Sequence, residues 1–368
     1  MAWAEIEFKP EEVNAAGRKL AAMNFPVDTS DGVEALSIIN NWRASHAYPL
    51  NTFQVTLRRK AKKIEKEIIV AQRIKRLESI HRKLSDKKSM RMTQMQDIAG
   101  CRVVFRNISS IKKLVNLYKS SRFEHEFRGE KDYITYPKIE GYRCHHIVYQ
   151  YKGTEKTKIY DGLRVEIQIR TQLQHAWATA VEAVGIFTRQ ALKSSQGDQD
   201  WLRFFALMGS AIAAMEECNP VPNTPTSKDL LVAEIAALSE KLQVDRMLRV
   251  YNATIENIGS AKDAKYFLIE LNPDESRIRI TRFKALQSEK ANREYTRMEG
   301  AQAEGSRVQI ALVSVEHINA LRRAYPNYFL DTATFGGLVS RVLKGDFPAP
   351  LLGQASPATD QQPHPPRD

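Results

Sequence analysis

The octapeptide RVEIQIRT, at residues 164–171, indicates what kind of fold this sequence can form. Polar and apolar residues alternate along it, as expected of a β-strand whose successive side chains point to opposite faces of a sheet. One face carries Val165, Ile167 and Ile169, and the other carries Arg164, Glu166, Gln168 and Arg170. A sheet seldom places four polar side chains in a row on one side unless that side binds a ligand. The octapeptide therefore predicts a strand with one core face and one functional face.

Further elements extend outward from this strand. Strands are predicted at CRVVF (101–105), FEHEF (123–127) and HHIVYQY (145–151), with a helix at 111–120. The first 90 residues read as helices, at 9–23, from about 31 and from Asn51 onward. Helical spacing returns at 172–184, at 201–215 and from Asp229 towards Ile258. The fold class is therefore predicted as α+β or mixed α/β, a mixed sheet flanked by helices.

Residues 262–345 read as a second, smaller α/β module. A hairpin is predicted at 265–271 and 277–283, followed by a helix (284–298), a strand (308–314) and a helix (315–324). The proline-rich tail is predicted to be disordered. The expected organisation is N-terminal helices (1–50), a catalytic domain (51–220), a connecting helix (221–260), a C-terminal module (261–345) and the tail (346–368).

Composition limits the functional classes. The chain has 368 residues and a net charge of +12, which favours an anionic partner such as a nucleotide or nucleic acid. The longest apolar stretch, FFALMGSAIAAM from Phe204, is too short to span a bilayer, and no signal peptide is recognisable. The three cysteines form no C-x-x-C pair. We therefore expect a cytoplasmic protein with no membrane partner, disulfide framework or zinc site.

The positive charge is concentrated. Residues 58–91 contain 14 Lys and Arg against four acidic residues, which gives this segment +10 of the total. A charge run is usually a solvated helix face. Here, however, Arg73, Lys75, Ser79 and Lys83 follow one another at spacings that would suit a polyphosphate. Neither common glycine-rich phosphate loop occurs in the sequence.

Three more motifs accompany the basic segment. They are DIAGCR (97–102), KDYIxxPKxxGY (131–142) followed by His146, and EIQIRT (166–171). Together with RIKxxxSIxxK (73–83), they resemble the synthetase domain of RelA/SpoT alarmone synthetases, particularly the small single-synthetase kind. The resemblance covers roughly residues 40–190 and implies a nucleotidyltransferase-like sheet.

The resemblance also implies an activity, the transfer of the β,γ-pyrophosphate of ATP to a ribose 3′-hydroxyl. It assigns Asp97 and Glu166 to catalysis and to Mg²⁺, with Glu166 also activating the hydroxyl. The implied ATP-binding residues are Arg73 and Arg102 around the adenine, with Lys75, Ser79 and Lys83 on the triphosphate. The implied acceptor-binding residues are Lys131, Tyr142, His146, Gln168 and Arg170. Trp177 is expected to serve packing.

The sequence departs from the family pattern in the acceptor region. The family usually has a Ser-Leu pair before the histidine, whereas this chain has Cys144 and His145. The resemblance therefore leaves the identity of the acceptor open. No H-D motif precedes the basic segment, so we expect synthesis without a hydrolase activity.

A narrower resemblance concerns the C-terminal module. Tyr325-Pro-Asn-Tyr328 is similar to the Y-x-x-Y element of fused toxin–antitoxin (CapRel-type) members of the family. There the module inhibits the ATP site until a phage protein relieves it, and the toxin modifies the 3′-terminal adenosine of tRNA. Tyrosines at this spacing also commonly pack a core.

Three functions remain open from the sequence. A tRNA-modifying toxin is slightly favoured, because the basic segment holds more cations than a triphosphate needs. An alarmone synthetase would use GDP or GTP as acceptor. A non-catalytic nucleic-acid-binding module would also explain the charge, but not the pair of carboxylates.

Overall fold

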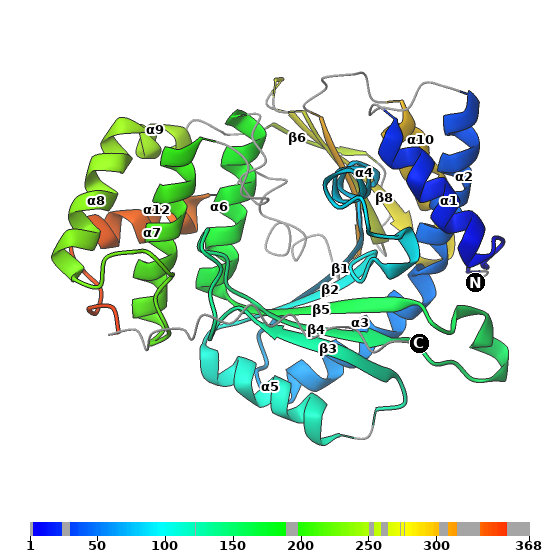
Figure 1. The fold of residues 1–368 in the computed structure, drawn as a ribbon, viewed down its shortest axis with the longest axis horizontal. Coiled ribbons are helices and arrows are strands. Elements are labelled where there is room, and N and C mark those ends of the chain that lie inside the picture. The colour runs from blue at the N-terminus through cyan, green and yellow to red at the C-terminus, as the bar shows by residue number, and fades with distance from the viewer. Residues whose placement is uncertain are drawn as a thin grey trace.

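The computed structural model describes residues 3–23, 30–121, 123–188, 198–249, 254–258, 264–272, 274–275, 277–301, 308–314 and 332–351 (Figure 1). The α-helices are α1 Pro10–Ala22, α2 Ser30–Ser45, α3 Ala47–Lys62, α4 Leu77–Asp86, α5 Ile108–Ser120, α6 Gln172–Thr188, α7 Gln199–Met215, α8 Lys228–Lys241, α9 Val244–Arg249, α10 Ser288–Gly300 and α12 Ala333–Leu343. The strands are β1 Ile69–Ile74, β2 Ala99–Phe105, β3 Glu126–Asp132, β4 His145–Gln150, β5 Arg164–Thr171, β6 Thr254–Ile258, β7 Ala264–Asn272, β8 Arg277–Lys284 and β9 Gln309–Ser314.

All the described strands belong to one mixed sheet, in the order β3-β4-β5-β2-β1-β9-β7-β8-β6. The pairs β2·β5 and β6·β8 are parallel, and the other neighbours are antiparallel. The mixed sheet with flanking helices confirms the predicted fold class (Figure 1).

The alternation in β5 divides the sheet into two chemically different faces. Val165, Ile167 and Ile169 are fully buried, whereas Glu166 and Gln168 are only partly buried. Helix α3 covers the apolar face, where the Cys101 thiol lies 3.7 Å from the carbonyl oxygen of Leu50. Helix α5 lies on the same side of the sheet (Figure 1). The polar face carries the site residues that the sequence predicts.

A second core lies beside the sheet, between α6, α7, α8, α9 and α12 (Figure 1). Helix α7 is buried along nearly its whole length, in keeping with its long apolar run. Phe335 of α12 packs against Phe205 of α7, with ring centroids 5.7 Å apart. The residues that follow α12 are also packed here, because Phe347 is 6% exposed.

The structure corrects three sequence predictions. Strand β1 lies within the first 90 residues, all of which were read as helical. Residues 254–258 form strand β6, whereas the helical pattern was expected to continue to Ile258. Strand β3 begins at Glu126 and ends at Asp132, later than the predicted strand at 123–127. In β1 and β3 charged residues obscure the strand pattern, because each strand has a polar or exposed face.

The two predicted modules share the sheet. Strand β9 pairs with β1 through Gln72↔Ser314 and Arg73↔Val313, so the C-terminal strands extend the sheet at the edge formed by β1. The predicted domain boundaries stay predictions. Tyr325, Tyr328 and residues 352–368 of the tail lie outside the described residues.

Two further expectations concern the membrane and the cysteines. Within the part of the chain that the structure describes, no helix is both long and apolar enough to cross a membrane. Cys101, Cys144 and Cys218 are all free thiols.

Candidate active site

Strand register brings the predicted site residues together in two rows across the polar face. In the first row, Arg73 of β1 pairs with Gly100 of β2, which pairs with Glu166 of β5. The second row lies two residues along and crosses four strands: Arg102, Gln168, His146 and Lys131. Residues far apart in sequence thus become lateral neighbours, because paired strands align side chains on the same face.

The first row opens into a cleft with an empty volume of about 430 Å³. Six predicted site residues line it: Arg73, Lys75, Asp97, Arg102, Glu166 and Gln168. A concave site lined by a small number of convergent polar groups is typical of small-molecule binding. Gly100 lies in the floor of the cleft and adds no side chain there.

Asp97 joins two of the predicted phosphate-binding lysines. Its carboxylate oxygens each lie 2.8 Å from an ammonium nitrogen, Oδ2 from Lys75 and Oδ1 from Lys83. Burial alone would raise the pKa of Asp97, but the two lysines outweigh it and hold the pKa well below its usual range. The carboxylate is therefore ionised at neutral pH and keeps both lysine side chains at the cleft.

Glu166 ends a chain of hydrogen bonds that leads to the loop of residues 133–144. Its Oε1 lies 2.8 Å from Nδ1 of His146, and its Oε2 accepts a 2.7 Å bond from Gln168. The other ring nitrogen of His146 lies 2.8 Å from the hydroxyl of Tyr142. The site therefore couples a carboxylate, an imidazole and a phenol across three structural elements.

Burial and these hydrogen bonds set the protonation states of Glu166 and His146. Burial raises the pKa of Glu166 and the Asp97 carboxylate raises it further, yet His146 and Gln168 together lower it. Burial lowers the pKa of His146, but Tyr142, Cys144 and Glu166 together raise it well above its ordinary value. Glu166 is thus held as a carboxylate beside an imidazolium.

The donor set fits a magnesium ion that is shared with a substrate. No cluster of three or more His, Cys, Asp or Glu side chains suited to a metal occurs among the described residues. Mg²⁺, however, commonly uses only one or two protein carboxylates and completes its shell with phosphates and water. Asp97 and Glu166 are both ionised and are close enough for Asp97 to raise the pKa of Glu166. They are the residues that would hold the ion.

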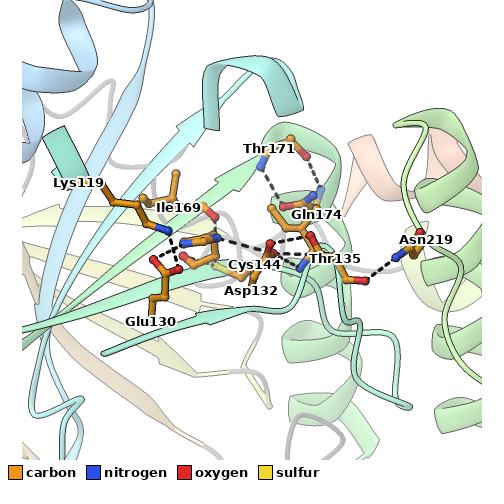
Figure 2. A network of polar contacts seen from close by, with 11 residues as sticks. Lys119, Glu130, Asp132, Thr135, Cys144, Ile169, Thr171, Gln174 and Asn219 are labelled. Carbon is orange, nitrogen blue, oxygen red and sulfur yellow. Dashed lines mark hydrogen bonds and ion pairs between the residues drawn. The ribbon is translucent and has the colours of Figure 1, made fainter. Parts of the chain in front are cut away.

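The loop of residues 133–144, here called the acceptor loop because it carries the predicted acceptor-binding Tyr142, is anchored at its start by Asp132 (Figure 2). The Asp132 carboxylate accepts hydrogen bonds from the backbone N–H groups of Ile134 and Thr135 and from the Thr135 hydroxyl. His145 lies behind it, with Nδ1 3.6 Å from Asp132 and Nε2 3.7 Å from Glu130. The unusual His145 therefore belongs to the support of this loop rather than to the cleft.

The same loop is held from the other side by α7 and the residues after it. Asn219 donates a 2.7 Å hydrogen bond to the carbonyl oxygen of Thr135. Arg143 forms a buried 2.9 Å ion pair with Glu216, which also accepts a 2.9 Å hydrogen bond from Gln174. The loop is thus fixed before any substrate binds.

The remaining predicted residues differ in how closely they approach the cleft. Arg170 lies on the polar face but is 4% exposed, and Lys131 is exposed at the edge of the sheet. Ser79 is half-buried in the first turns of α4. Trp177 is buried and donates its indole N–H to the Phe205 carbonyl at 2.8 Å, which is a packing role.

Sequence reasoning missed the supporting residues Asp132, Arg143, His145, Glu216 and Asn219. Asp132 and Arg143 fall inside or beside a motif, but nothing in their spacing shows which partner they meet. His145 was noted only as a departure from the family pattern. Glu216 and Asn219 follow a separate helix and carried no local signal.

The region of the chain that matches a known family contains the predicted site residues. Residues 72–190 match the family described as "Region found in RelA / SpoT proteins". The chain is 36% identical over 116 residues to GTP pyrophosphokinase YwaC of Bacillus subtilis (strain 168), covering 29% of this chain and 52% of that protein. It is 35% identical over 85 residues to GTP pyrophosphokinase YjbM of the same organism, covering 23% of this chain and 39% of that protein. The match thus spans about half the length of these curated relatives, or less.

Solved structures give similar matches. The small alarmone synthetase 1 from Bacillus subtilis, bound to its product pppGpp, is 29% identical, with coverage of 39% of this chain and 78% of that one and a TM-score of 0.34. The small alarmone synthetase 2 from the same organism is 22% identical, with coverage of 49% and 94% and a TM-score of 0.41.

The mixed sheet carries a polar, cation-lined cleft with two carboxylates, an arrangement suited to an anionic ligand that binds with a metal ion. More specifically, residues 72–190 of the chain form a region of the RelA/SpoT type.

Proposed function

We propose that this protein is a pyrophosphokinase that transfers the β,γ-pyrophosphate of ATP to a ribose 3′-hydroxyl. One observation carries the proposal: Lys75, Asp97 and Glu166 line one cleft, and Lys83 of α4 forms an ion pair with Asp97 there. Transfers of this kind depend mostly on positioning and on neutralising the charge of the phosphates. The RelA/SpoT region and the names of the curated relatives support the same activity.

In this reaction a bond forms between the acceptor O3′ and the β-phosphorus of ATP. The bond between that phosphorus and the α,β-bridging oxygen breaks, AMP leaves, and the 3′-hydroxyl loses its proton. A magnesium ion held by Asp97 and Glu166 would neutralise charge on the phosphates when bound. Lys75, Ser79 and Lys83 would hold the triphosphate, and Arg73 and Arg102 would flank the adenine.

The acceptor would bind beside Glu166. Tyr142 would stack on the acceptor base, while His146, Gln168, Arg170 and Lys131 would support the nucleotide. His146 keeps Glu166 ionised and aligned, so the carboxylate can accept the proton from the 3′-hydroxyl or orient it. The low pKa of Glu166 favours its role as a metal ligand over a role as a strong base.

A guanine nucleotide is the acceptor that we propose. The curated relatives carry the name GTP pyrophosphokinase, which favours GDP or GTP. The surplus cations of the basic segment are the feature that favours tRNA. Five of them, at positions 58, 59, 60, 62 and 63, lie on α3 or its C-cap, on the opposite side of the sheet from the cleft. They are therefore poorly placed to bind an acceptor in the cleft.

The experiment offers all acceptors together. Purified protein is incubated with γ-³²P-labelled ATP, Mg²⁺, GDP, GTP and bulk tRNA, and the labelled products are separated. We expect label on a guanine nucleotide, and none with Glu166→Gln. Label on tRNA would instead support the toxin function, for which Tyr325 and Tyr328 are the proposed inhibitory residues and a phage protein the proposed trigger. No label on any acceptor, with salt-sensitive tRNA binding unaffected by Glu166→Gln, would support the non-catalytic alternative.

A further inference from the structure

A buried ion pair joins the N-terminal and C-terminal parts of the chain. Arg43 of α2 and Glu299 of α10 meet at 2.9 Å, and their side chains are only 4% and 6% exposed. The hydroxyl of Tyr295 accepts a 3.0 Å hydrogen bond from Arg43 and donates one of 2.7 Å to Glu299. Burying two charges is costly unless both gain good partners, so a pair of this kind needs further contacts.

Those further contacts are on the backbone that carries the predicted ATP-binding side chains. Arg43 donates its Nε–H to the carbonyl oxygen of Lys75 at 3.1 Å. Glu299 accepts the backbone N–H of Leu77 at 3.1 Å. Arg43 and Glu299 thus bind the backbone on either side of Arg76, where β1 ends and α4 begins.

This short junction determines where the three predicted phosphate-binding residues lie. Lys75 extends from it to Asp97, and Leu77 begins the helix that carries Ser79 and Lys83. The Leu77 N–H is one of the unsatisfied donors at a helix N-terminus, and the Glu299 carboxylate satisfies it. Strand β9 lies against the preceding residues, Gln72 and Arg73. The C-terminal part of the chain therefore contacts the ATP side of the site through backbone hydrogen bonds.

We infer that Arg43 and Glu299 are a positioning pair that fixes the junction between β1 and α4 and so holds Lys75, Ser79 and Lys83 ready for the ATP triphosphate. The inference rests on the proposed function, because it names residues that act on the same ATP site. It gives α10 a supporting role in ATP binding. Displacement of α10 by a ligand or partner would weaken the ATP site.

The test compares Glu299→Ala and Glu299→Gln with Glu294→Gln in the full-length protein. Glu294 lies on the same helix and forms an exposed ion pair with Arg297 at 2.6 Å, so it is a matched control. The probe is α,β-methylene-ATP with Mg²⁺, which cannot undergo transfer, and its binding is measured by calorimetry. Thermal unfolding of each variant is recorded alongside.

We expect Glu299→Ala to bind the analogue about tenfold more weakly, since it leaves Arg43 and the Leu77 N–H without this partner. Glu299→Gln keeps an oxygen for Leu77 but loses the charge, so its affinity should fall between those of the alanine variant and the wild type. Glu294→Gln should match the wild type. The KM for ATP should rise with the dissociation constant, while the KM for the acceptor stays unchanged.

A folded Glu299→Ala protein that binds the analogue as well as Glu294→Gln does would overturn the inference and leave Glu299 a purely structural residue. If the alanine variant does not fold, Glu299→Gln decides the matter in the same way. A wild-type protein that does not bind the analogue would instead refute the proposed function, and the inference with it.

Discussion

Substitution of Gly141 by alanine provides a sensitive test of how the acceptor loop is held. Gly141 precedes Tyr142 and has a φ of +95°, a conformation that side chains other than glycine rarely adopt. A Cβ there would lie 2.8 Å from the carbonyl oxygen of Phe205 and 3.1 Å from Cα of Ala206. That carbonyl already accepts the Trp177 indole N–H at 2.8 Å, so it cannot move freely.

Gly162 provides the control. Its φ of +88° is nearly the same, but its Cβ would meet only the Gln150 amide, at 3.7 Å. The left-handed conformation costs each alanine variant about 1–2 kcal/mol. Overpacking against α7 should add about 1–3 kcal/mol for Gly141→Ala alone. The entropic gain from replacing glycine is common to both variants and cancels in the comparison.

The assay is urea unfolding followed by steady-state kinetics. We expect Gly141→Ala to lose about 1–3 kcal/mol more unfolding free energy than Gly162→Ala. It should also raise the KM for the acceptor, because Tyr142 moves with its neighbour, while the affinity for α,β-methylene-ATP stays unchanged. Equal losses of stability in the two variants would refute the close approach of the loop to α7.

Other substitutions test the charges of the site. Glu166→Gln should reduce transfer by about 10²–10³-fold, as measured by product formation. Thermal unfolding should show a folded protein that has lost the stabilisation of the His146 ion pair; near-normal transfer would exclude Glu166 from catalysis. Folding raises the pKa of His146, so its ion pair with Glu166 stabilises the fold fully at pH values below about 6.5, the pKa of the unfolded state. This contribution is lost as the pH rises through the pKa that His146 has in the folded protein. The stability difference between wild type and His146→Gln, measured by urea unfolding at several pH values, should therefore shrink at alkaline pH, and a constant difference would contradict the assignment. Glu216→Ala should cost about 3–5 kcal/mol of unfolding free energy, because it leaves the buried Arg143 without its carboxylate partner; Glu216→Gln should cost less, and a harmless alanine variant would show that the pair is not needed.

Local patterns predicted much of the fold and of the candidate site. The alternation of β5 correctly separated its core face from its polar face, and the helical spacing of α6 and α7 matches the observed helices. Six of the predicted site residues line one cleft. These successes have a common cause, because side-chain direction within a strand or helix follows from short-range geometry.

The errors also have a common cause. Strand β1 carries Gln72 and Arg73 within a basic segment, and its identity as a strand depends on pairing with β2 and β9. Strand β6 follows a helical stretch, and its partner among the described strands is β8. Strand propensity depends on the neighbours that a strand acquires, so a single stretch of sequence does not decide it.

The sequence by itself determined which chemical groups are available: a cation-rich segment, two carboxylates, and a strand that presents polar side chains on one face. Only the tertiary structure decided which residues hold those groups in place. Glu216 reaches the acceptor loop from beyond α7, and Glu299 reaches the Lys75–Leu77 backbone from α10. Neither contact leaves a periodic signal in the sequence, because its partner is chosen by the packing of distant elements and by the need to satisfy buried charges.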